Sequence, residues 1–176
     1  VMAPMIATAD EARRFAGLAR ERNLHPGVMI EVPAAALLAD RILEHVEFLS
    51  IGTNDLAQYT MAADRMSSDL AALTAPWQPG VLALVAQTAR AGQAVGKPVG
   101  VCGEAAADPL LACVLIGMGI TSLSMAPAAV RRAVSAVSAS RLAVGSSRIT
   151  IGAARRMTRA IASRWRSPPL SRRPFS

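Results

Sequence analysis

Three short apolar segments of the chain end in side chains that could do chemistry. The run from Val46 to Ile51 is followed by Gly52-Thr53-Asn54-Asp55, which presents an amide and a carboxylate. A second run ends in Glu31, and a third ends in the thiol of Cys102. In α/β folds, side chains at the carboxyl ends of neighbouring parallel strands converge on one pocket. We therefore expect two carboxylates, an amide and a thiol to share a site.

The elements that must position these residues alternate between strands and helices, a pattern that favours a parallel sheet with crossover helices. The first helix, capped by Thr8 or Asp10, is expected to bury Phe15, Leu18 and Ala19. Residues 64–78 are expected to form an irregular polar loop. The expected strands are residues 1–6, 27–31, 46–52, 99–102 and 122–125, and the expected helices are 8–23, 33–43, 56–63, 79–95, 109–118 and 128–140.

This pattern of elements gives an α/β fold with too few strands for a closed eight-stranded barrel, which typically needs about 250 residues. The chain has 176 residues, enough to bury one domain core. The fold class we expect is therefore a partial barrel, with the missing strands preceding Val1.

Composition narrows the class of protein. The chain is 52% hydrophobic with a mean hydropathy of +0.34, which is typical of a globular protein. A run of about 18 apolar residues without a charge or turn former would be needed to span a membrane, and none is found. Two cysteines, Cys102 and Cys113, suit a reduced cytoplasmic compartment rather than a disulfide framework.

The charge is divided unevenly along the chain. Residues 1–130 hold eight Lys/Arg and all twelve Asp/Glu, whereas residues 131–176 hold eleven Arg and no acidic residue. We therefore predict an acidic barrel segment over residues 1–140 and a basic, largely disordered tail over 141–176. Within this tail, residues 149–165 could form a basic amphipathic helix. The Arg/Ser/Pro composition of the whole tail is also typical of an out-of-frame reading of a GC-rich gene.

Three motifs of the chain resemble a known family. Ser50-Ile-Gly-Thr-Asn-Asp-Leu-Ala-Gln58 is a highly specific match, and Val28-Met-Ile-Glu-Val-Pro-Ala-Ala35 and Val101-Cys-Gly-Glu104 support it in order and spacing. Residues 1–138 thereby resemble the C-terminal, phosphoenolpyruvate (PEP)-binding barrel of enzyme I of the bacterial sugar phosphotransferase system, in the PEP-utilising family. The resemblance implies a partial (βα)8 TIM-type barrel covering strands 4 to 8.

The resemblance also implies a role for each matching residue. Glu31 and Asp55 would hold Mg²⁺, which prefers one or two carboxylates together with substrate oxygens and water. Asn54 would hydrogen-bond the phosphoryl group, and Arg65 would neutralise its charge. Cys102 would protonate the enolate carbon of pyruvate after phosphoryl loss, a task that suits a thiol ionising near about pH 8.5.

Each of these assignments has a structural alternative. A carboxylate at a strand end, such as Glu31 or Asp55, can cap the next helix, and an isolated cysteine such as Cys102 can be a small core residue. An arginine in a polar loop, such as Arg65, can simply be solvated. The flanking motifs favour the chemical roles. Two roles are open for Glu104, that of a pocket residue and that of a helix cap.

The resemblance further implies the partners. PEP would be converted to pyruvate as a protein histidine is phosphorylated, and the phosphate would pass to a histidine-containing phosphocarrier protein. That histidine would lie on a separate N-terminal domain, because neither His25 nor His45 has the glycine-rich Ser/Thr-His context. The barrel would form a homodimer in the cytoplasm, without a membrane partner. The isolated chain is expected to be inactive, because the family's phosphohistidine domain and upstream arginines are absent from it.

Three other readings remain open. A fragment of a pyruvate phosphate dikinase or PEP synthase would share the pocket but serve a nucleotide-dependent reaction. A non-catalytic binding or dimerisation module would keep the carboxylates without the chemistry. A specific nucleic-acid binder is disfavoured, because the aromatic residues of the basic tail number only Trp165 and Phe175.

Overall fold

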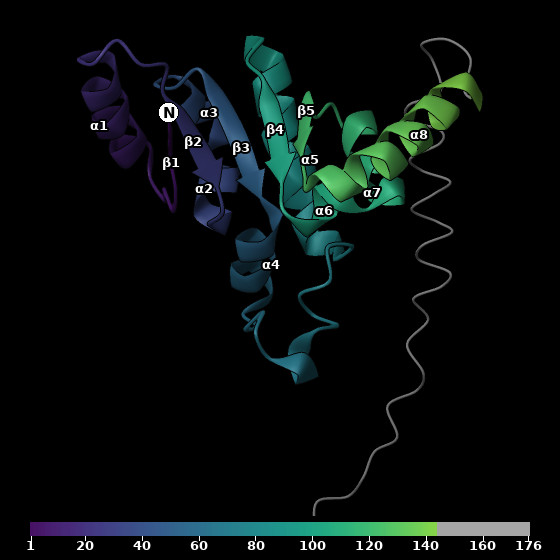
Figure 1. The fold of residues 1–176 in the computed structure, drawn as a ribbon. Coiled ribbons are helices and arrows are strands. Elements are labelled where there is room, and N and C mark those ends of the chain that lie inside the picture. Colours follow the sequence, from purple (N-terminus) through teal and green to yellow (C-terminus); the bar gives the residue numbers. More distant parts are fainter. Residues whose placement is uncertain (144–176) are drawn as a thin grey trace, which may run out of the picture.

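The structure is a computed structural model that describes residues 1–143. Its five-stranded sheet is parallel throughout, and the strands lie side by side in chain order (Figure 1). The strands are β1 (Met2–Ala3), β2 (Gly27–Ile30), β3 (Phe48–Gly52), β4 (Val99–Cys102) and β5 (Ser122–Ser124). This arrangement confirms the predicted α/β fold and is that of consecutive strands of an incomplete βα barrel.

Helices connect successive strands and cover one face of the sheet. They are α1 (Ala9–Arg20), α2 (Pro33–Leu37), α3 (Ala39–Leu43), α4 (Thr53–Met61), α5 (Pro79–Val95), α6 (Glu104–Ala107), α7 (Pro109–Gly117) and α8 (Pro127–Ala143). A short 3₁₀ helix, Ser68–Leu70, interrupts the loop between α4 and α5. Helix α4 projects beyond the carboxyl ends of β2 and β3 (Figure 1). Within residues 1–143, no helix combines the length and the apolar character needed to cross a membrane.

The two faces of the sheet differ because side chains alternate along each strand. Val28, Leu49, Ile51 and Val101 belong to the hydrophobic core and are at most 2% exposed. The opposite face carries a row of neighbouring residues in register: Met29, Ser50, Gly100 and Ser122. Met29 and Ser50 are only partly buried and Ser122 is exposed, so this inner face is open.

Helix α1 differs from its sequence prediction in the residues it buries. Ala12, Ala16 and Ala19 form the buried stripe, whereas Leu18 is 55% exposed. The prediction for Leu18 was wrong because consecutive residues are turned about 100° apart on a helix, so Leu18 points away when Ala19 points inward. Phe15 packs partly against the core, as predicted.

Two other predicted helices differ from the structure, and one further helix was not predicted. The helix predicted over residues 33–43 is divided at Leu38, whose φ of −101° and ψ of 19° leave the helical range. Helix α4 begins at Thr53 rather than Leu56, which places Asn54 and Asp55 in its first turn. Helix α6 follows Gly103 directly and was not predicted, because four residues are too short for a periodic pattern.

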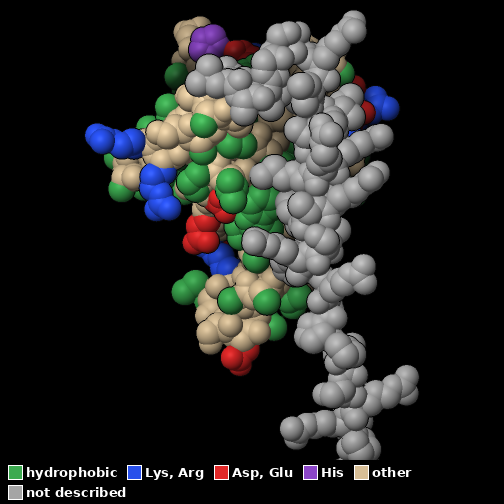
Figure 2. All heavy atoms as spheres, turned by 90° about the vertical axis from the view of Figure 1, so that its right-hand side faces the viewer, with side chains coloured by type: hydrophobic (Ala, Val, Ile, Leu, Met, Phe, Trp, Pro, Cys, Tyr) green, Lys and Arg blue, Asp and Glu red, His purple; other side chains and the backbone are tan. Residues whose placement is uncertain are grey.

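Helix α8 packs beside α7, next to the edge of the sheet that is formed by β5 (Figure 1). Figure 2 looks onto this side of the molecule and shows hydrophobic side chains at the surface. Leu110, Val130 and Val134 are exposed. The domain boundary predicted at residue 140 stays a prediction, and the predicted basic tail lies outside the described residues from 144 onward.

Candidate active site

Glu31 follows β2 directly and is held firmly at the carboxyl end of the sheet. Its side chain is buried at 5% exposure, and Oε2 accepts a hydrogen bond of 2.9 Å from the backbone N–H of Met5. Met5, the donor, has a φ of 56°, a left-handed conformation that is uncommon outside glycine. A Cβ atom on Gly52 would lie 2.7 Å from Glu31 Cγ, so the glycine makes room for the carboxylate.

Asp55 lies in the first turn of α4, where a helix N-terminus favours a negative charge. Its Oδ1 atom is 3.7 Å from Nη1 of Arg65, which comes from the loop after α4. The backbone N–H of Arg65 donates to Gln58 Oε1 on α4 at 3.3 Å, which helps fold the loop back. The Asp55 and Arg65 side chains are 31% and 45% exposed, so both remain accessible to a ligand.

The ends of β3 and β4 are tied together by side chains. Thr53 Oγ1 donates to the carbonyl of Cys102 at 3.0 Å, and Asn54 Oδ1 accepts from the backbone N–H of Glu104 at 3.2 Å. Gly103 has a φ of 95°, and a Cβ there would lie 2.9 Å from Asn54 Oδ1. The Glu104 contact fixes the Asn54 amide with its oxygen toward the protein and leaves its amino group for a ligand.

Cys102 ends β4 and is half-buried, with its sulfur between two groups of β3. Ser50 Oγ lies 3.7 Å from Sγ, and the carbonyl oxygen of Ile51 lies 3.4 Å from Sγ. Cys113 is different, because it lies within α7 and its thiol donates to the carbonyl of Pro109 at 3.3 Å. Both thiols are free, and only Cys102 belongs to the carboxyl ends of the strands.

Comparison with known proteins identifies the fold and the family. The family model for the PEP-binding domain of PEP-utilising enzymes matches residues 1–142. The chain belongs to this family. The resemblance drawn from the three motifs is therefore confirmed.

Among relatives of this PEP-utilising domain, the phosphoenolpyruvate-protein phosphotransferase of Streptomyces coelicolor is 58% identical over 132 residues, covering 74% of this chain and 24% of the relative. The enzyme of the same name from Latilactobacillus sakei is 41% identical over 145 residues, covering 75% of this chain and 25% of the relative. The chain thus spans about a quarter of the length of these relatives.

Solved structures support the fold alone. RipC from Yersinia pestis superposes with a TM-score of 0.57 at 14% identity, covering 77% of this chain and 62% of that one. A HpcH/HpaI aldolase/citrate lyase family protein from Burkholderia cenocepacia has a TM-score of 0.57 at 19% identity, covering 80% and 64%. These similarities agree with a partial barrel of the TIM type.

The donor set of this PEP-binding domain suits a magnesium ion. Within residues 1–143, no group of three or more His, Cys, Asp and Glu side chains is placed to hold a metal ion. Mg²⁺ does not need such a cage, because it is commonly held by one or two carboxylates together with substrate oxygens and water. Glu31 follows β2, and Asp55 lies in the first turn of α4, which follows the adjacent strand β3. The pre-positioned Glu31 carboxylate fits this role.

Several residues that shape the site were missed in the sequence. They are the backbone N–H groups of Met5 and Glu104, the hydroxyls of Ser50 and Thr53, and the space left by Gly52 and Gly103. The two glycines could have been recognised from the sequence, since a glycine beside a polar strand end often marks a place where another group approaches the backbone closely. The hydroxyls gave none, because their partners on β4 are far away in the sequence.

Proposed function

We propose that this chain forms the PEP-binding part of a phosphoenolpyruvate-protein phosphotransferase, which transfers a phosphoryl group from PEP to a protein histidine and yields pyruvate. The observation that carries the proposal is the pair of bonds between strand ends, Thr53 to the Cys102 carbonyl and Glu104 N–H to Asn54. They hold the first turn of α4, which carries Asn54 and Asp55, against the end of β4, which carries the thiol. Phosphate-binding and proton-donating groups can therefore face a single small substrate.

Asn54 and Arg65 are the groups proposed to bind the phosphoryl group. The Asn54 amino group can donate to a phosphoryl oxygen, because Glu104 N–H already occupies its carbonyl oxygen. Arg65 contacts Asp55 only loosely, at 3.7 Å, and is partly exposed. Its guanidinium can therefore turn to a phosphate while staying near the carboxylate. Charge neutralisation of this kind is the main task in phosphoryl transfer.

Glu31 and Asp55 are proposed to hold Mg²⁺, which would supply Lewis-acid polarisation of the substrate oxygens. The chain itself prepares the two carboxylates differently. Glu31 is buried and fixed by Met5 N–H, so it loses little freedom on binding an ion. Asp55 is partly exposed and shares its charge with Arg65, so it can adjust to the substrate.

Cys102 is proposed to complete the reaction as a general acid. When the phosphoryl group has left PEP, the remaining enolate must gain a proton at carbon three to become pyruvate. The Cys102 S–H bond breaks as the new C–H bond forms, and the electron pair of the S–H bond stays on sulfur. The enolate oxygen becomes a carbonyl. Water then returns a proton to the thiolate.

The remaining partners follow from the same proposal. The phosphate would pass through a histidine on another domain to a phosphocarrier protein, at the start of sugar uptake. The barrel would pair with a second copy as a homodimer. A cytoplasmic location is supported by two free thiols, Cys102 and Cys113.

A segment exchange tests the proposal. Residues 1–142 replace the matching segment of the S. coelicolor relative, and transfer from radiolabelled PEP to a phosphocarrier protein is measured. We expect transfer at a rate comparable to that of the relative, with loss of activity in the Asp55→Asn version. The 176-residue chain alone serves as a negative control and should not transfer phosphate.

Two results would contradict the proposal. A folded exchange protein that binds Mg²⁺ and PEP but transfers nothing would favour a non-catalytic module. An exchange protein that forms pyruvate only when a nucleotide is added would favour a dikinase or synthase.

A further inference from the structure

The loop between α4 and α5, residues 62–78, carries Arg65 and extends beyond α4 before it returns to the sheet (Figure 1). Loops of this length with little regular structure are usually either functional or disordered. The start of the loop is tied to α4, because the backbone N–H of Arg65 donates to Gln58 Oε1 at 3.3 Å. The position of Arg65 relative to Asp55 therefore also depends on how the rest of the loop is held.

Trp77 holds the far end of the loop. Its indole Nε1 donates to Oδ2 of Asp108 at 3.0 Å, and its ring packs partly against the hydrophobic core. Within residues 1–143, this is the one hydrogen bond that ties the loop to an element other than the two helices it connects. The carboxylate is a charged acceptor, so the bond belongs to the stronger class.

The Asp108 carboxylate is oriented by a second set of contacts. Its Oδ1 atom caps α7 by accepting from the backbone N–H groups of Leu110 and Leu111, at 2.8 and 3.1 Å. Pro109 begins the helix and restricts its first turn. The two carboxylate oxygens therefore have separate partners, and the helix cap keeps Oδ2 directed at the indole.

The segment after β4 thereby contacts both ends of the connection that follows β3. Near the start of that connection, Asn54 Oδ1 accepts from the backbone N–H of Glu104. Near its end, Trp77 donates to Asp108, four residues further along the same segment. Helix α4 and the loop are thus attached to the body of the domain at two points.

Between Arg65 and Trp77, the loop is folded by short-range hydrogen bonds. Gln78 is buried at 7% exposure, and its Nε2 donates to the carbonyl of Ala72 at 2.7 Å. Successive backbone hydrogen bonds close turns over residues 64–67, 67–70 and 70–74. Because these turns follow one another without a gap, a restraint at Trp77 is passed along the loop to Arg65.

We propose that Trp77 is a positioning residue, which through Asp108 keeps the loop docked and the Arg65 guanidinium beside Asp55. Its meaning for PEP rests on the proposed function. Trp77 does not touch the substrate in this scheme. It orders the arginine in advance, so that less conformational freedom is lost when the phosphoryl group binds.

Trypsin measures the docking of the loop directly. Arg65 is the single Lys or Arg of the loop, and Met66 after it is 84% exposed. When opening is fast relative to cleavage, the cleavage rate follows the population of the open form. Trp77→Phe keeps an aromatic ring but loses the N–H, and should speed cleavage after Arg65 in the full chain about tenfold, the effect of one hydrogen bond to a charged group. Cleavage after Arg22, measured on the same samples by mass spectrometry, should not change.

Asp108→Asn is the matched change on the other side of the bond. Asn caps a helix about as well as Asp, so α7 keeps its cap, but the amino group that replaces Oδ2 cannot accept from the indole. We expect the same increase in cleavage as in Trp77→Phe. The double variant should show no further increase, because both changes remove one bond. Trp165→Phe, the same substitution at the other tryptophan of the chain, is the control and should leave the rate unchanged.

A second measurement tests whether Trp77 acts through Arg65. In the exchange protein with the S. coelicolor relative, Trp77→Phe should weaken Mg²⁺-dependent PEP binding severalfold, in proportion to the lost docked fraction. In the Arg65→Ala background, Trp77→Phe should cause no further weakening. Calorimetry measures both.

Three results would overturn the proposal. They are an unchanged cleavage rate after Arg65 in Trp77→Phe, effects of Trp77→Phe and Asp108→Asn that simply add, and a loss of PEP affinity that persists without Arg65. An equal increase in cleavage after Arg22 would also count against it, because it would indicate general unfolding. The cleavage test needs neither PEP nor a phosphocarrier protein, so it can fail while the proposed function stands. An exchange protein that does not bind PEP would count against that function and leave the cleavage result in force.

Discussion

The polar groups at the two ends of the sheet differ in how fully they are hydrogen-bonded within the fold. At the amino end, the ammonium group of Lys97 donates to the carbonyls of Leu43 and Val46 at 2.5 and 2.9 Å. Thr121 Oγ1 both accepts from the N–H of Val99 and donates to its carbonyl. These groups make their hydrogen bonds to backbone groups within the fold.

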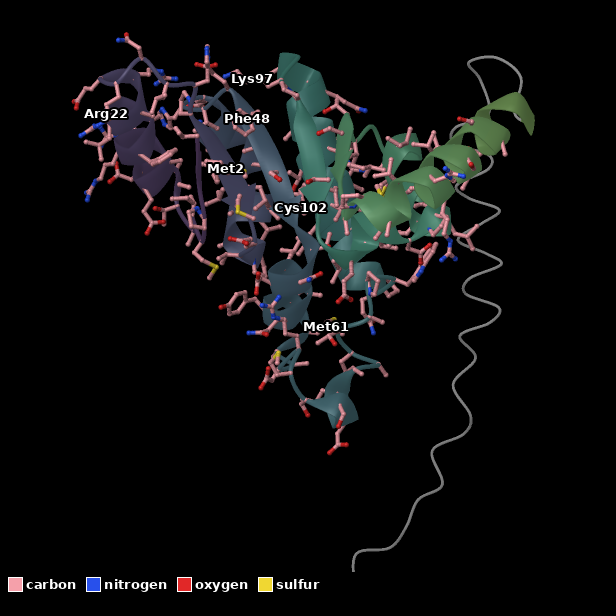
Figure 3. All side chains as sticks on the ribbon, viewed as in Figure 1. Met2, Arg22, Phe48, Met61, Lys97 and Cys102 are labelled. Atoms are coloured by element: carbon pink, nitrogen blue, oxygen red, sulfur yellow. The ribbon has the colours of Figure 1, made fainter. Side chains whose placement is uncertain are left out.

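At the carboxyl end, polar side chains are held in place, but only part of their hydrogen-bonding capacity is satisfied within the fold. The loosest pair is Asp55 with Arg65, at 3.7 Å, and both remain partly exposed. Figure 3 shows Lys97 and Phe48 toward one end of the sheet, with Cys102 further along and Met61 of α4 beyond it. In βα barrels the carboxyl ends of the strands commonly carry the functional groups and the opposite end stabilises the fold, and the two ends of this sheet differ in the same direction.

The largest expected effect lies at the carboxyl end. In the exchange protein, Cys102→Ala should lower the rate of pyruvate formation by about 10²–10⁴, because a positioned general acid is lost. Magnesium and PEP binding should be retained, since the thiol holds no charge of the substrate. Proton delivery to carbon three should also lose its stereospecificity, which deuterium labelling of pyruvate measures.

Cys113→Ala is the control for this change. Cys113 lies in α7 and bonds only to its own helix, so its removal should leave turnover unchanged. The reverse outcome, a silent Cys102→Ala and an inactive Cys113→Ala, would mean that the wrong thiol has been assigned. It would also remove the functional distinction between the two ends of the sheet.

The next effect lies at the amino end. Lys97→Met keeps the aliphatic stem but leaves the carbonyls of Leu43 and Val46 without their charged donor. We expect the free energy of unfolding to fall by about 3 kcal/mol, in line with two hydrogen bonds from a charged group. Urea denaturation of the full chain measures it. A stability loss of this size from Asp55→Asn, with none from Lys97→Met, would invert the comparison.

Two glycines, one at each end of the sheet, allow the two ends to be compared directly, because each makes room for a side chain of a neighbouring segment. A Cβ on Gly27 would lie 2.2 Å from the ring of Phe48, and a Cβ on Gly52 would lie 2.7 Å from Glu31 Cγ. Either change to Ala should cost about 2 kcal/mol through overpacking. In the exchange protein, only Gly52→Ala should also weaken Mg²⁺-dependent PEP binding, which calorimetry measures.

The double variant Gly27→Ala/Phe48→Leu is the control, because the smaller side chain should recover most of the lost stability. If Gly27→Ala weakens PEP binding as much as Gly52→Ala, the amino end is coupled to the site. The separation of stability from function would then be wrong.

The sequence was sufficient for the number and order of the strands, because apolar runs ending in Gly and polar residues are local patterns, although β1 is limited to Met2–Ala3. It was insufficient wherever a contact depends on register. The Ser50–Cys102 contact joins residues 52 positions apart, and the Met5–Glu31 bond joins residues 26 positions apart. Leu18 failed for a similar reason, since hydrophobicity alone does not say which of two adjacent helical residues points inward.

One polar cluster near the carboxyl end of β1 does not belong to the site, and it gives the smallest predicted effect. Thr8 caps α1 and forms a capping box with Glu11. The backbone N–H groups of Ala7 and Thr8, followed by the Thr8 hydroxyl, lower the pKa of Glu11. Like Lys97, Glu11 makes its hydrogen bonds within the fold.

Glu11→Gln should therefore lower the melting temperature slightly. Because the folded-state pKa of Glu11 is lowered, its stabilising contribution is fully present above the pKa of an unfolded Glu, about 4.3. It is lost as the pH falls through the lower folded-state value. The difference in melting temperature between the two proteins should thus be largest near neutral pH and shrink in acid. A difference that stays constant over this range would show that the charge of Glu11 contributes nothing, and that a neutral amide caps the helix as well.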